Sequence, residues 1–102
     1  RDRLGKKPIF YAETSQGFSF SSELTSLLCD KSIERSVNYK AIDEYLGYLF
    51  VPHPLSIYNN IIKLPPATWM VVNEKSSNRT GSFWNVQVRS INQSYFIHCY
   101  TA

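Results

Sequence analysis

Histidine and cysteine, the side chains that most often bind metals or act as nucleophiles, are few in this sequence and poorly spaced for either task. They are His53, His98, Cys29 and Cys99. Only His98 and Cys99 are neighbours, and no pair has the ligand spacing of about two to four residues that is typical of a zinc site. Two distant cysteines do not indicate a disulfide scaffold either, so we expect a reducing compartment.

Ser22 and Glu23 place a hydroxyl beside a carboxylate, which is the second arrangement that could do chemistry. No Gly-x-Ser-x-Gly elbow surrounds the serine, as the nucleophile of a hydrolase would require. The pair is better explained as the start of a helix, with Ser21 or Ser22 as the capping hydroxyl and Glu23 in the first turn.

Arg1, Asp2 and Arg3 form a charged cluster that could bind phosphate. Gly5 is a single glycine, however, and does not make a phosphate-cradling loop, so a charged turn before a strand is the better interpretation. The net charge of the chain is +3, but its 11 Lys and Arg residues are scattered along the sequence. Nucleic-acid binding is therefore not expected, because it needs basic residues clustered on one face.

The composition fits one small domain: 102 residues, of which 43% are hydrophobic and 15% aromatic. No stretch approaches the roughly 20 apolar residues that span a bilayer, and no basic-then-apolar leader is present. We expect a cytoplasmic protein that does not bind membranes, and the sequence does not indicate an oligomeric state.

The elements that must position these residues begin with a β-hairpin at residues 8–21. Aromatic and small residues alternate in its second strand, which places Phe18 and Phe20 on one face. A short helix over 22–30 should follow, and its buried positions would be Leu24, Leu27 and Leu28. The segment DKSIERS is then expected to be a polar connector.

A second helix is predicted over 39–50, with Asn38 as its cap and with Pro52 and Pro54 ending it. Its apolar side chains recur at helical spacing and should be buried; they are Ala41, Ile42, Tyr45, Leu46 and Leu49. Residues 51–67 read as an irregular loop pressed onto the core. A strand over 68–75, a turn over 76–81 and a returning strand over 82–86 complete an α+β pattern.

Four segments, taken in order, resemble one known family. They are RDRLGKKPIFY, SSELTSLL, AIDEYLGYLFVPHPLSIYNNIIKLPPATWMVV and FWNV. The chain is similar to the second half of the glutaminase domain in the glutamine-hydrolysing asparagine synthetase family, where it runs into the linker to the synthetase domain. The residues that fit the family's motifs and that we assign structural roles are Arg1, Asp2, Gly5, Lys7, Pro8, Ser22, Glu23, Pro52, Pro54, Lys63, Pro65 and Pro66.

The resemblance covers residues 1–84, and it dissolves in residues 85–102, which form an unmatched tail. Thr25, Ala67 and Phe83 depart from the usual Lys, Gly and Tyr of the family's motifs. The first two motifs also occur in other class II amidotransferases. The third and fourth motifs favour the asparagine synthetase type.

The resemblance implies part of an Ntn-type α/β/β/α sandwich that is incomplete in this chain. In this family an N-terminal cysteine attacks glutamine and releases ammonia, which a second domain transfers to aspartate activated by ATP and Mg²⁺. By this resemblance the nucleophile and the glutamine-binding residues would precede Arg1, and the pyrophosphate loop would follow Ala102. We therefore assign no catalytic, cofactor-binding or metal-binding residue to the chain, and we predict that the isolated chain is an inactive fragment.

Two alternatives remain open at this point. One is an amidotransferase that acts on another carboxylate acceptor, such as a sugar acid of a surface polysaccharide, since it would share the same glutaminase half. The other is a non-catalytic interaction module derived from that half. Upstream coding sequence with Met-Cys would favour an enzyme, whereas a start codon near residue 1 would favour the module.

Overall fold

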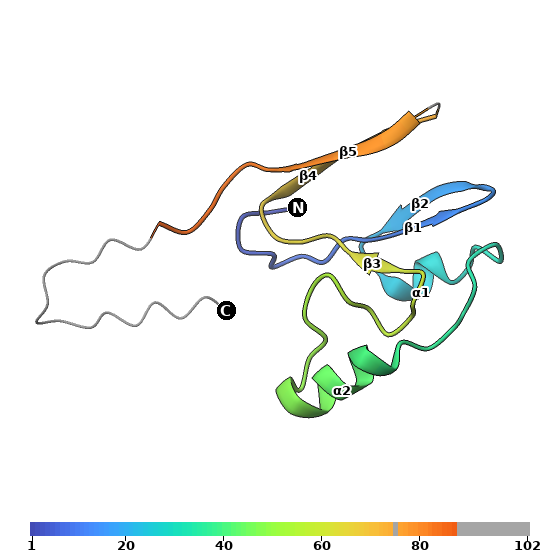
Figure 1. The fold of residues 1–102 in the computed structure, drawn as a ribbon, viewed down its shortest axis with the longest axis horizontal. Helices are drawn as coiled ribbons and strands as arrows, with labels where there is room; N and C mark the ends of the chain where they lie inside the picture. Colours follow the sequence, from blue (N-terminus) through green and yellow to red (C-terminus); the bar gives the residue numbers. More distant parts are fainter. Residues whose placement is uncertain (75, 88–102) are drawn as a thin grey trace, which may run out of the picture.

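The computed structural model describes residues 1–74 and 76–87, which fold into two antiparallel sheets and two helices (Figure 1). The first sheet has the strand order β2-β1-β3, and the second pairs β4 with β5. The bounds are β1 Phe10–Thr14, β2 Gly17–Ser21, α1 Leu24–Leu27, α2 Tyr39–Tyr48, β3 Ile62–Lys63, β4 Thr68–Asn73 and β5 Ser76–Ser82. The predicted α+β class is confirmed. The four-layer sandwich stays a prediction, and most of the predicted tail, residues 88–102, lies outside the described residues.

The predicted hairpin is confirmed as β1 and β2, whose register pairs Phe10 with Ser21 and Thr14 with Gly17. The rings of Tyr11 and Phe18 stack across the strands with centroids 5.6 Å apart. β1 also pairs with β3 on its other side, so it is the central strand of the first sheet. Within the described residues β2 is an edge strand, and its Phe20 is 73% exposed.

The helix predicted over 22–30 is shorter in the structure, where it is α1, and the prediction of a serine N-cap is wrong. Glu23 occupies the N-cap position with no side-chain capping bond, and Ser22 is exposed. Ser21 is the last residue of β2 and lies two positions before the N-cap, and its hydroxyl accepts a hydrogen bond from the backbone N–H of Glu23. Among the predicted core positions Leu27 is buried, and Leu24 and Leu28 are half-buried.

The core lies where α1 covers the first sheet. Its buried residues are Ala12, Leu27, Ile33 and Ile61, with Phe10, Leu24, Leu28 and Tyr58 packed around them. Ile33 belongs to the segment that was expected to be a polar connector. The segment turns inward because the Asp30 carboxylate accepts hydrogen bonds from the Ser19 hydroxyl and from the backbone and hydroxyl of Ser32.

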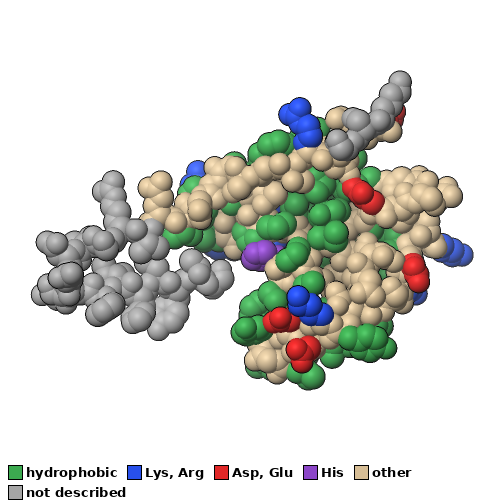
Figure 2. All heavy atoms as spheres, viewed as in Figure 1, with side chains coloured by type: hydrophobic (Ala, Val, Ile, Leu, Met, Phe, Trp, Pro, Cys, Tyr) green, Lys and Arg blue, Asp and Glu red, His purple; other side chains and the backbone are tan. Residues whose placement is uncertain are grey.

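Helix α2 has the predicted cap, because the Asn38 side chain accepts from the backbone N–H groups of Lys40 and Ala41. The helix ends earlier than predicted, since Leu49 adopts a left-handed conformation with φ 64° ahead of the prolines. The predicted buried stripe is largely wrong: Ala41 is buried, but Leu46 and Leu49 are 73% and 80% exposed. No described strand or helix covers this face, and Figure 2 shows apolar side chains at the surface over α2.

Residues 51–67 are pressed onto the core, as predicted, with Ile61, Leu64 and Ala67 buried. Ser56 is also buried, and its hydroxyl lies 2.6 Å from the carbonyl oxygen of Ile61. The two-residue strand β3 within this segment was not predicted, and it ties the loop to β1.

The second sheet forms where a strand, a turn and a returning strand were expected, but the turn over 76–81 is wrong. Those residues belong to β5, and of the strand predicted over 82–86 only Ser82 is in β5. The reason is a cross-strand contact: Gly81 lies opposite Trp69, and a Cβ on Gly81 would come within 2.6 Å of the indole ring. Covering a strand glycine with an aromatic ring favours pairing at this position. In the described part of the chain, neither helix has the length and apolar content needed to cross a membrane.

Candidate functional site

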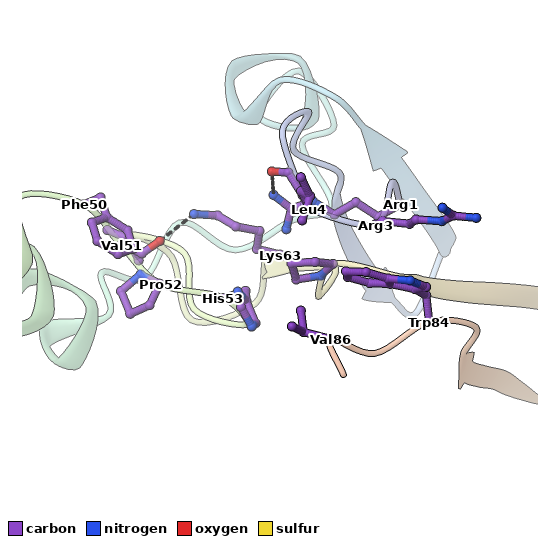
Figure 3. A pocket seen from close by; sticks show the side chains of 12 residues that line it. Arg1, Arg3, Leu4, Phe50, Val51, Pro52, His53, Lys63, Trp84 and Val86 are labelled. Atoms are coloured by element: carbon purple, nitrogen blue, oxygen red, sulfur yellow. Dashed lines mark hydrogen bonds between the residues drawn. The ribbon is translucent and has the colours of Figure 1, made fainter. Parts of the chain in front are cut away.

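Four segments that are far apart in the sequence meet around one groove of about 520 Å³ (Figure 3). They are the N-terminal turn, the residues that follow α2, the segment from β3 to the proline pair, and the residues that follow β5. The lining residues are Arg1, Arg3, Leu4, Gly5, Phe50, Val51, Pro52, His53, Lys63, Pro66, Trp84 and Val86. The groove therefore brings together Arg1, Gly5, Pro52, Lys63 and Pro66 of the predicted structural residues, with Trp84 beside them.

Arg1 fixes one wall of the groove through its planar guanidinium group. Nη1 donates to the carbonyl of Leu64 at 2.6 Å, Nη2 to that of Gly5 at 2.7 Å, and Nε to that of Lys7 at 3.0 Å. A fork of N–H donors suits such a set of carbonyl oxygens, whereas a lysine would offer a single point charge. The side chain thereby ties the N-terminal turn to the segment that follows β3.

Asp2 closes the same turn. Its carboxylate accepts from the backbone N–H groups of Lys6 at 2.9 Å and Lys7 at 3.3 Å, and its carbonyl accepts from Gly5 and from Ala67. These backbone hydrogen bonds, that of Lys6 first, lower the pKa of Asp2 below its ordinary value. The ionised carboxylate is therefore the form that holds the turn.

Gly5 is required where the turn meets the proline pair. Its φ is +65°, and a Cβ would lie 2.7 Å from Cγ of Pro66 and 3.1 Å from the guanidinium carbon of Arg1. A side chain at this position would therefore be strained and would collide with two groups of the groove wall.

Lys63 reaches from β3 across the groove to the segment after α2. Its Nζ donates to the carbonyl of Val51 at 2.6 Å (Figure 3). The same Nζ lies 5.7 Å from the centre of the Phe10 ring. Its backbone N–H donates to the carbonyl of Pro54 at 2.8 Å. Burial lowers the pKa of the ammonium group, and the charge of Arg1 lowers it further.

The remaining predicted residues lie outside the groove. Ser22 and Glu23 are exposed next to α1, and Pro54, which follows a cis peptide bond, is also exposed. Pro8 and Pro65 are half-buried, on either side of the hydrogen bond from the Leu64 N–H to the Ile9 carbonyl.

The groove lacks several side-chain types that commonly act in catalysis. None of its lining residues is Ser, Thr, Cys, Asp or Glu, so it contains neither a hydroxyl or thiol nucleophile nor a carboxylate base. Across residues 1–74 and 76–87, no three His, Cys, Asp or Glu side chains gather as a metal site would require. Cys29 is exposed, and His98 and Cys99 lie outside the described residues.

Sequence reasoning missed Leu4, Phe50 and Val86 as lining residues, and it considered Arg3 for phosphate and His53 for a metal without assigning either a role. Each of these residues is adjacent to, or two positions from, a motif residue that does line the groove. Proximity to the motifs is therefore a signal that could have identified them. What the sequence did not show was that these motifs meet in space.

Comparisons with known proteins identify the family. The family model described as a glutamine amidotransferase domain matches residues 1–84. The chain is 36% identical over 89 residues to putative asparagine synthetase [glutamine-hydrolyzing] 2 of Methanocaldococcus jannaschii, covering 84% of this chain and 17% of the relative. It is 33% identical over 101 residues to asparagine synthetase [glutamine-hydrolyzing] 2 of Bacillus subtilis, covering 93% of this chain and 14% of the relative.

The chain thus spans less than a fifth of the length of these curated relatives. No solved structure matches it. The matched residues include every predicted structural residue, from Arg1 to Pro66, together with Trp84. The chain belongs to the glutamine amidotransferase domain family, and the relatives it resembles over this segment are named as asparagine synthetases.

Proposed function

We propose that this chain is the structural second half of a glutaminase domain, in a protein that transfers ammonia from glutamine to aspartate. The observation that carries the proposal is the family match over residues 1–84, together with relatives that are named as glutamine-hydrolysing asparagine synthetases. Aspartate as acceptor, ATP as the second substrate and a cytoplasmic location are parts of this proposal.

The chain's own contribution is to hold the scaffold. Arg1 joins the N-terminal turn to Leu64, β3 joins residues 51–67 to β1, and Lys63 joins β3 to the segment after α2. We assign the attack on glutamine to residues outside this chain, because Cys29, the only cysteine among the described residues, is exposed and follows α1 within the chain. A family nucleophile of this kind needs its own free α-amino group as the base.

We also propose that ATP and Mg²⁺ are bound outside this chain. The described part contains no cluster of three candidate metal ligands, and the sequence contains no glycine-rich phosphate loop. We therefore assign nucleotide and metal binding to the rest of the protein and derive no step through them here.

The experiment is to read the encoding DNA on both sides of this segment and to express the continuous frame. The purified protein is given glutamine, aspartate and ATP with Mg²⁺, and asparagine is measured. Asparagine that depends on all three substrates would support the proposal. Ammonia release from glutamine without asparagine would mean a different acceptor, and a frame that begins close to residue 1 and yields no ammonia would favour a non-catalytic module.

A further inference from the structure

Helix α2 carries an apolar surface that lies open to solvent (Figure 2). Ile42, Tyr45, Leu46 and Leu49 recur at the spacing that places side chains on one face of a helix. On and around this face, six large side chains are 50–81% exposed. These six residues, which we call the α2 patch, are Tyr39, Tyr45, Leu46, Tyr48, Leu49 and Phe50.

The area of the α2 patch exceeds that of ordinary protein surface. With roughly 200 Å² of surface on each large side chain, the six residues leave about 800 Å² uncovered. The largest apolar patch on a monomeric protein is usually about 300–600 Å², and larger patches mark interaction sites. A standard protein–protein interface buries about 800 Å² on each partner. The α2 patch therefore has the area that a stable dimer needs.

Leu49 is strained and exposed at the same time. It ends α2 in the left-handed conformation, with φ 64°, which glycine and asparagine adopt more readily than leucine. Its side chain is 80% exposed, so the strain is not offset by burial within the described chain. A leucine at this position is explained if a second molecule covers it.

The apolar face is complementary to a second copy of itself. Two α2 helices that pack antiparallel, about a two-fold axis beside Tyr45 and Leu46, place Ile42 of each copy opposite Leu49 of the other. The same arrangement places Tyr45 of each copy opposite Leu46 of the other. Every contact along the face is then apolar on both sides.

The charged side chains of α2 do not oppose this pairing. Lys40, Asp43 and Glu44 have the same three- and four-residue spacing among themselves, so they lie together on another face of the helix. Pairing through the apolar face therefore takes no charge of α2 out of water, which would be costly.

We propose that two copies of this chain pair through the α2 patch, with their α2 helices antiparallel across a two-fold axis. Leu46 and Leu49 lie at the centre of the interface, and Tyr48 and Phe50 lie at its rim. The rings of Tyr48 and Phe50 already pack together with centroids 6.0 Å apart, so this part of the rim is formed before pairing. The pairing uses no catalytic residue and does not depend on the proposed function.

The test is sedimentation equilibrium of the 102-residue chain over a range of concentrations. We expect a reversible equilibrium between the 11.8 kDa chain and a species of twice that mass, with a micromolar Kd, because interfaces of this area range from micromolar to picomolar affinity. Leu46→Glu should weaken the dimer at least about a hundredfold, because the two-fold axis brings two buried carboxylates into the interface.

Two further variants separate pairing from folding. Leu49→Asn removes an apolar contact and suits the left-handed conformation, so it should weaken the dimer at least about tenfold. Its urea midpoint, measured at a concentration where the chain is monomeric, should not fall. Phe20→Glu is the matched control, because Phe20 on β2 is 73% exposed, as Leu46 is, and lies outside the α2 patch. The Kd of the Phe20→Glu dimer should equal that of the parent.

A chain that stays monomeric up to about 500 µM, a concentration at which only very weak pairing escapes detection, would overturn the proposal. A dimer that Leu46→Glu and Leu49→Asn leave intact would also overturn it, and so would a dimer that Phe20→Glu abolishes. The same equilibrium is measured for a chain that ends at residue 87. Pairing by this shorter chain alone would mean that residues 88–102 cover the α2 patch in place of a second copy, and would contradict the proposal.

Discussion

Gly5→Ala is expected to destabilise this fold strongly. Gly5 has a φ of +65°, and the added Cβ would lie 2.7 Å from Cγ of Pro66 and 3.1 Å from the guanidinium of Arg1. Neither neighbour gives way easily. The proline lies between the buried residues Leu64 and Ala67, and the guanidinium is held by three carbonyl groups.

Two costs add at this position. An L-residue in the left-handed region costs roughly 1–2 kcal/mol. Forcing an extra carbon into a packed contact costs typically about 1–3 kcal/mol. The free energy of unfolding should therefore fall by about 2–5 kcal/mol, which is a large share of the roughly 5–15 kcal/mol of a whole domain.

Two other glycines separate these costs. Gly17 has a φ of +142° but open space around its Cβ position, so Gly17→Ala carries the backbone strain alone. Gly47 lies in α2 with open space and without a positive φ, so Gly47→Ala should stabilise the helix by about 0.5–1 kcal/mol. The assay is urea unfolding of the 102-residue chain and its three variants, followed by tryptophan fluorescence.

The expected order of stability is Gly47→Ala, then the parent chain, then Gly17→Ala, then Gly5→Ala. Unfolding of Gly5→Ala at the same urea concentration as Gly17→Ala would contradict this order. In that case the contact with Pro66 and Arg1 would relax at no cost, and the groove wall would not be rigid.

Three further predictions concern the same turn. Ala67 has a φ of 53° and stands where the family's motif has glycine. Ala67→Gly should therefore raise the free energy of unfolding by about 1 kcal/mol in urea titrations. A loss of stability would show that burial of the methyl group outweighs the strain. Folding lowers the pKa of Asp2. Its carboxylate therefore stabilises the fold at pH values above the pKa of the unfolded state, and this stabilisation is lost as the pH falls through the pKa of the folded state. The free energy of unfolding, measured from pH 7 down to pH 2, should therefore decline below about pH 4, and this decline should be shallower in Asp2→Asn. An equal decline in the parent and in Asp2→Asn would contradict this role. Arg1→Gln should cost about 2–4 kcal/mol, because it leaves carbonyl groups of Gly5, Lys7 and Leu64 without a charged donor; Arg3→Gln, on an exposed side chain, is the matched control and should be neutral.

The elements that local chemistry specifies were predictable from the sequence. The alternating Phe18 and Phe20 indicated β2, and the position of Asn38 ahead of an apolar helical repeat indicated α2 and its cap. Each of these signals lies within a few residues of the structure that it predicts.

Features that depend on distant partners were not predictable. The strand β5 forms because Gly81 lies under Trp69, although its own residues are typical of a turn. The apolar face of α2 carries a core-like pattern, but whether Leu46 and Leu49 are buried depends on what lies against them. Periodicity indicates which side chains form an apolar face, but it does not show whether another segment packs against that face.

The groove could not be predicted from the sequence for the same reason. Its walls come from residues 1–5, 50–53, 63–66 and 84–86, and each segment alone resembles a turn or a loop. The motifs were visible in the sequence, but their meeting depends on the hydrogen bonds of Arg1 and Lys63 to carbonyl groups more than ten residues away.

The central claim is that this chain supplies the scaffold of a glutaminase domain whose catalytic residues lie elsewhere. The most direct test is a chimera in which residues 1–84 replace the aligned segment of asparagine synthetase 2 of Bacillus subtilis, with ammonia release from glutamine as the measurement. We expect the chimera to release ammonia from glutamine and the isolated 102-residue chain to release none. A folded chimera without glutaminase activity, or turnover of glutamine by the isolated chain, would contradict it.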